Sequence, residues 1–149
     1  MSSTSTSRAC RPGSGSDTMG DVFAVILESG VPERLYTGLS LLVSAASAGE
    51  EARGLATFGS LGALLDPELE ARARHEATHV VDAEREAFAR TLVELRAAAQ
   101  ELPDCRIWAC AAAVQAAGAD WATVSERLEG VTSIPSFLHD VAGARLVVV

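Results

Sequence analysis

The stretch that decides the fold spans residues 21–49, "DVFAVILESGVPERLYTGLSLLVSAASAG". It begins with an apolar run rich in Val, Ile and Phe and then reaches Ser29 and Gly30, which is typical of a buried parallel strand entering a tight turn. Pro32 follows at a helix start, apolar residues recur at helical spacing, and Gly49 marks a stop. A strand that leads directly into a helix predicts the first half of a βαβ unit.

The rest of the chain repeats this alternation. The expected elements are a strand at 53–58, a short helix and a polar segment within 61–82, an amphipathic helix at 83–102, a strand at 105–110 after a turn at 103–104, helices on both sides of Gly118, and a last strand at 144–149. Strands that alternate with helices indicate βαβ crossovers. We therefore predict an α/β fold with three layers, α/β/α, and a mainly parallel open sheet of about five strands.

Composition limits the function classes. A chain of 149 residues that is 48% hydrophobic suits one domain, which we place at 19–149 after a disordered, Ser/Thr/Gly-rich tail at 1–18. Twelve basic residues stand against 20 acidic ones and form no cluster, which argues against binding to nucleic acid. No apolar run approaches the length of a membrane span. We expect a cytoplasmic protein that associates with no membrane.

The cysteines direct attention to one thiol. Three cysteines in a chain without a secretory signal argue against a disulfide framework. Cys110 ends the third expected strand just before a helix, where free N–H groups and the helix dipole favour the nucleophilic thiolate. Cys105 lies five positions earlier, roughly 16 Å away along a strand and beyond disulfide reach, so it is most simply a core residue. Burial of Cys110 as another small core residue is an equally open alternative.

Five segments form a recognisable set: "VILESG" (25–30), "ERLYTGLSLLVSAASAG" (33–49), "LATFGSLGALL" (55–65), "CRIWACAAAVQAAG" (105–118) and "RLEGVTSIPSFLHDVAGARLVVV" (127–149). Together they resemble the DsrE/DsrF-like family of sulfur-relay, peroxiredoxin-like proteins. The resemblance implies that Cys110 carries sulfur as a persulfide between a donor and an acceptor protein, without a cofactor. It further implies a homo-oligomer, a trimer or hexamer, and a pocket formed by Ser29, Gly30, Phe58 and Gly59.

A different chemistry is suggested by "RHEATHVVD" (74–82), which contains the order H-E-x-x-H. On a helix, His75 and His79 would share one face and could bind Zn²⁺, with Glu76 activating a metal-bound water. A zinc protease also needs a long central helix and a third ligand, for which His139 is a candidate that nothing else marks. A metal at an oligomer surface and a pair of solvated histidines without chemistry are the other interpretations.

Three function hypotheses follow from the sequence. The leading one is a sulfur relay through a persulfide on Cys110. The second is a non-catalytic oligomeric module that binds a ligand or partner, with Cys110 in a structural role. The third is a metal-binding protein or metal-dependent hydrolase that uses His75, Glu76 and His79.

Overall fold

The computed structural model describes residues 21–149, so the tail expected at 1–18 and the domain start expected at 19 lie outside the described residues. The strands are β1 (Val22–Leu27), β2 (Glu51–Ala56), β3 (Cys105–Cys110), β4 (Gly130–Thr132) and β5 (Arg145–Val148). The helices are α1 (Pro32–Ser47), α2 (Phe58–Leu65), α3 (Leu69–Glu76), the short 3-10 helix η2 (Asp82–Glu84), α4 (Arg85–Glu101), α5 (Ala111–Ala117), α6 (Trp121–Arg127) and α7 (Ile134–Asp140).

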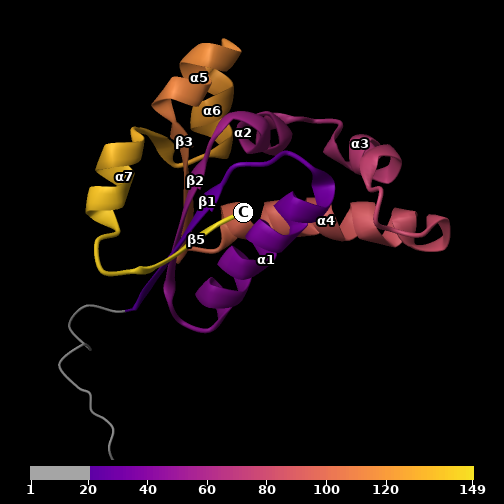
Figure 1. Ribbon diagram of the computed structural model, residues 1–149, viewed down its shortest axis with the longest axis horizontal. Helices are drawn as coiled ribbons and strands as arrows, with labels where there is room; N and C mark the ends of the chain where they lie inside the picture. The colour runs from indigo at the N-terminus through magenta and orange to yellow at the C-terminus, as the bar shows by residue number, and fades with distance from the viewer. Residues whose placement is uncertain (1–20) are drawn as a thin grey trace, which may run out of the picture.

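The five strands form one sheet in the order β4-β3-β2-β1-β5, and every neighbouring pair is parallel (Figure 1). This confirms the predicted α/β fold with an open, five-stranded parallel sheet flanked by helices. Helices connect successive strands, as parallel pairing requires. The order leaves β4 and β5 at the two edges of the sheet.

Helices cover the two faces of the sheet unequally. Side chains alternate along a strand, so Phe23, Val25 and Leu27 share one face, and all three are buried. On this face α1 packs closely, because a Cβ atom at Gly54 of β2 would lie 3.1 Å from the side chain of Leu42. Figure 1 shows α1 and α4 on one side of the sheet and α7 on the other, with α5 and α6 beyond one end.

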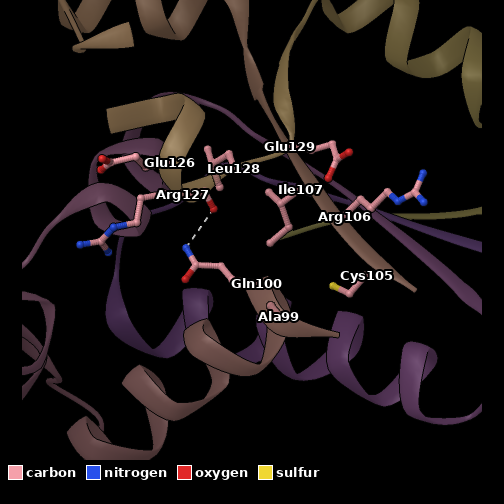
Figure 2. Close-up of a pocket in the computed structure, with 9 residues that line it drawn as sticks. All are labelled: Ala99, Gln100, Cys105, Arg106, Ile107, Glu126, Arg127, Leu128 and Glu129. Carbon is pink, nitrogen blue, oxygen red and sulfur yellow. Dashed lines mark hydrogen bonds between the residues drawn. The ribbon is translucent and has the colours of Figure 1, made fainter. Parts of the chain in front are cut away.

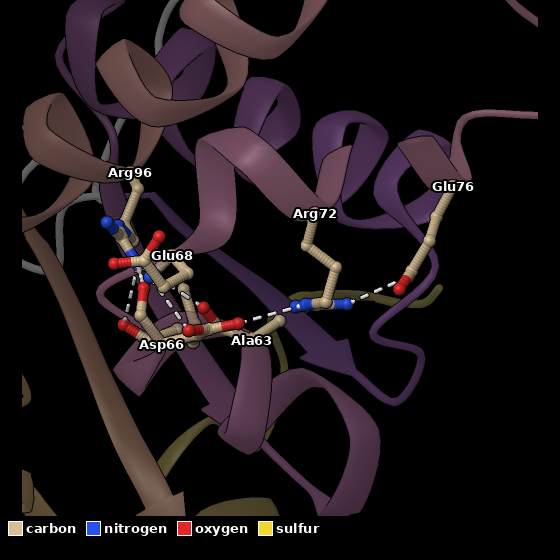
Figure 3. A network of polar contacts seen from close by, with 7 residues as sticks. Ala63, Asp66, Glu68, Arg72, Glu76 and Arg96 are labelled. Carbon is tan, nitrogen blue, oxygen red and sulfur yellow. Dashed lines mark hydrogen bonds and ion pairs between the residues drawn. The ribbon is translucent and has the colours of Figure 1, made fainter. Parts of the chain in front are cut away.

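A buried arginine ties α2 to its neighbours (Figure 3). Arg96 of α4 donates hydrogen bonds to the carbonyl oxygens of Ala63 and Leu64, both at 3.3 Å, and of Asp66 at 2.7 Å. These carbonyls lie at the end of α2, where helix carbonyls lack intrahelical partners and a cation is favoured. The backbone N–H of Glu68 and the guanidinium of Arg72 hold the pKa of Asp66 below its usual range. The α2–α3 junction is thereby fixed against α4.

Two sequence expectations need correction. The strand expected at 53–58 spans Glu51–Ala56 instead, because α2 already begins at Phe58. The N–H of Thr57, between them, donates both to the Leu27 carbonyl at 2.9 Å and to Ser60 Oγ at 3.1 Å. The short strand β4 and the helix α7 were not among the expected elements. Within the described range of residues 21–149, no helix combines the length and apolar character needed to cross a membrane.

Candidate functional site

The carboxyl ends of β1, β2 and β3 meet at one edge of the sheet. Leu27 of β1 pairs with Ala56 of β2, which in turn pairs with Ala109 of β3. The residues that follow these three therefore lie side by side along the edge. Cys110 is the last residue of β3 and immediately precedes α5. The predicted placement of this cysteine between a strand and a helix is therefore confirmed, while its chemical role stays a prediction.

The thiol of Cys110 is enclosed in this conformation. The residue is 1% exposed, and it lines neither of the two hollows described below. α5 begins at the next residue, and its first backbone N–H groups have no partners within the helix. A reagent or partner can reach the sulfur only after the surrounding chain shifts.

Two of the four expected pocket residues lie in direct contact through their backbones. A Cβ atom at Gly30 would lie 2.4 Å from the carbonyl oxygen of Gly59, and one at Gly59 would lie 2.9 Å from the nitrogen of Gly30. The turns after β1 and β2 therefore pack so closely that side chains are excluded. Ser29 lies beside this contact and uses its Oγ to accept the N–H of Val31 at 3.1 Å, which stabilises the entry into α1.

Phe58, the fourth expected pocket residue, has an unusual backbone and an exposed ring. Its φ is 39°, which is rare for a bulky residue, and its side chain is 56% exposed. Sequence reasoning missed the buried hydroxyls of Thr57 and Ser60, which both donate to the carbonyl of Leu27 and hold the second turn against the first. The T-x-x-S spacing, which resembles a helix cap, is the signal that could have revealed them.

A half-open cavity of about 160 Å³ lies near the opposite, amino-terminal end of β3 (Figure 2). Its lining residues are Ala99, Gln100, Cys105, Arg106, Ile107, Glu126, Arg127, Leu128 and Glu129. Gln100 of α4 spans it by donating to the carbonyl of Arg127 at 3.1 Å. Burial raises the pKa of the Cys105 thiol to about 11, so this sulfur stays protonated at neutral pH. Cys105 is buried, as predicted for a core residue.

The H-E-x-x-H stretch does not lie on a single helix. α3 ends at Glu76, so His75 lies on the helix whereas His79 lies beyond it, and both are exposed. The N–H of His79 donates instead to Glu33 Oε2 at 2.7 Å, and Glu76 pairs with Arg72. Among residues 21–149, no group of three His, Cys, Asp or Glu side chains is placed to hold a metal ion.

No model of a known protein family matches the chain, and no curated protein matches it either. The resemblance to DsrE/DsrF-like proteins therefore stays a prediction that rests on the quoted segments. Any function has to be argued from the edge of the sheet where Cys110, the paired glycines and Phe58 lie.

Proposed function

We propose that the chain is a DsrE-like sulfur carrier that holds sulfur as a persulfide on Cys110. The observation that carries the proposal is the place of this cysteine, at the junction of β3 and α5 on the carboxyl edge of an all-parallel sheet. Reactive groups of open α/β sheets collect at this edge. Homo-oligomerisation and a cytoplasmic location belong to the same proposal.

The reaction exchanges one sulfur–sulfur bond for another. The Cys110 thiolate attacks the outer sulfur of a donor persulfide, R–S–SH, and forms Cys110–S–SH while R–S⁻ leaves with the electron pair of the broken bond. An acceptor thiolate then attacks the outer sulfur and returns Cys110 to its thiolate. Because each step transfers neutral sulfur between two thiolates, the cycle needs no metal and no organic cofactor.

The burial of Cys110 adds a conformational step to this scheme. α5 has seven residues, and Ala113 is its one buried side chain. A short helix with so little buried surface is of the kind that opens locally at low cost. A docking donor or acceptor protein would uncover the sulfur by displacing α5, and the closed state would shield the persulfide between transfers.

A second candidate function is favoured by the same burial. If α5 stays closed, Cys110 is a small core residue and the chain is a non-catalytic, oligomeric module that binds a ligand or partner. An exposure of 1% is what such a structural role predicts. The two candidates therefore differ in whether sulfur reaches Cys110 in the folded protein.

Intact-mass spectrometry after incubation with glutathione persulfide separates them. The parent should gain the mass of one sulfur atom, and Cys110→Ser should not. Cys105→Ser is the matched control, because this buried cysteine lies on the same strand, and it should gain sulfur like the parent. Cys10→Ser controls for the third thiol. A parent that gains nothing, or a gain that persists in Cys110→Ser, would refute the relay and leave the binding module.

A further inference from the structure

The outer edge of β5 presents unpaired backbone. Val149, which continues this strand, donates its N–H to the Ile26 carbonyl at 2.9 Å and accepts the N–H of Glu28 at 2.7 Å, so it faces β1. Backbone groups of successive strand residues point to opposite sides, so Leu146 and Val148 direct theirs away from the sheet. Within the described chain, residues 21–149, no strand pairs with β5 on that side.

This edge is also apolar. Leu146 and Val148 are 43% and 60% exposed, and their alternation along β5 places both on one face. The single charged residue of the strand, Arg145, is paired with Glu50 and lies 5.0 Å from the centre of the Phe23 ring. Exposed edge strands are ordinarily protected by a charge, a proline or a bulge, and positions 146–149 contain no charged side chain and no proline.

A hollow continues the apolar surface onto the face that α1 covers. Its volume is about 270 Å³, and Phe23, Leu41, Ala45 and Ala48 supply its apolar wall. Arg145 also lines it, which places the hollow directly beside β5. A stable interface buries roughly 800 Å² on each partner, more than one short strand provides. Leu146 and Val148 lie on the opposite face of the sheet from the hollow, so apolar surface flanks the edge on both faces.

We propose that β5 of a second copy of this chain covers the edge, in antiparallel orientation about a two-fold axis at Val147, to form a continuous ten-stranded sheet. Leu146 then lies opposite the partner's Val148, and the outward N–H and C=O groups of both residues exchange hydrogen bonds across the axis. Val147 lies opposite the partner's Val147. Every backbone group that the edge leaves unpaired in one copy finds its complement in the other.

Composition favours a second copy over other occupants. The net charge of −8 opposes self-association in general, but this register places no two charged side chains opposite one another. The apolar side chains of residues 146–148 meet one another, and Arg145 faces the partner's Val149. The segment before Asp21 is rich in Ser, Thr and Gly and contains no apolar run that could match this edge. The two-fold pairing does not depend on any chemistry at Cys110. A trimer with only three-fold symmetry would have no such two-fold interface.

Sedimentation equilibrium of the full chain tests the proposal. The parent should sediment at twice its 15.5 kDa mass, or as a hexamer built from such pairs. Val148→Pro removes an outward N–H that makes no hydrogen bond in the monomer, and edge strands tolerate proline at such positions. This variant should sediment at half the mass of the parent. Val81→Pro is the matched control, since Val81 is 68% exposed with a φ of −67°, and it should leave the mass unchanged. Circular dichroism checks that both variants fold.

Cross-linking tests the register even if Val148→Pro fails to fold. In a Cys10→Ser background, Val147→Cys places two thiols across the axis at a Cα separation of about 4.5 Å, which suits a disulfide. Val148→Cys places them roughly 8 Å apart, too far for one. Mild oxidation should therefore cross-link the first variant and not the second. A parent that sediments as a monomer or trimer, or equal cross-linking at both positions, would overturn the proposal.

Discussion

Replacing Gly30 with alanine should destabilise the protein by forcing two turns apart. The new Cβ would lie 2.4 Å from the oxygen, 2.9 Å from the carbonyl carbon and 3.5 Å from the Cα of Gly59, all of which are main-chain atoms. Ordinary contact begins near 3.4 Å, so one turn must move by about 1 Å. Overpacking of this kind costs about 1–3 kcal/mol. We expect the free energy of unfolding of Gly30→Ala to fall by that amount.

The matched control is Gly62→Ala, the same chemical change within α2. A Cβ at Gly62 meets no atom within 4 Å outside the local helix backbone, and alanine is the better helix former. Gly62→Ala should therefore stabilise the protein by about 0.5–1 kcal/mol. Urea unfolding followed by circular dichroism measures both changes, which are expected to have opposite signs. If Gly30→Ala unfolded at or above the urea concentration of the parent, the close contact of the two turns would be wrong.

Two further predictions concern buried groups. Burial raises the pKa of Cys105 from 9.0 to about 11, so the thiol of the unfolded chain loses its proton at a lower pH than the thiol of the folded protein. The free energy of unfolding should therefore fall as the pH rises from 9 to 11, by up to about 1.4 kcal/mol per pH unit. Urea unfolding at pH 8 and pH 10 should show a smaller loss for Cys105→Ala, and an equal loss would contradict the assignment. Arg96→Met removes the donor from three carbonyls at the end of α2 and should cost about 1.5–3 kcal/mol in the same assay, whereas parent-like stability would show that this cap is dispensable.

The strand–helix alternation was sufficient to predict the fold, because β1 and β3 are apolar runs followed directly by helices. β4 escaped prediction because its three residues are too few to show a periodicity of two. α7 was missed although Ser133 caps it by accepting the N–H of Ser136, and Pro135 stands in its first turn. These are ordinary helix-start signals, but seven residues give little amphipathic pattern to support them.

The site was predictable only where it depends on local structure. The place of Cys110 follows from its own strand and helix, and it was found. The contact of Gly30 with Gly59 depends on the register between β1 and β2, which the sequence does not display. The arrangement of the two histidines was not predictable for a similar reason. α3 stops at Glu76, and the N–H of His79 bonds to Glu33, a residue 46 positions earlier in the chain.

The enclosure of Cys110 bears differently on the two candidate functions. A persulfide is itself nucleophilic and easily lost, so a carrier benefits from a closed state that a partner opens. Displacing α5, which begins at the next residue, would be inexpensive, because α5 buries one alanine side chain and a buried CH₂ or CH₃ group contributes only about 0.8 kcal/mol. A structural cysteine needs no such opening. Sulfur transfer to Cys110 in the folded protein therefore decides between the carrier and the binding module.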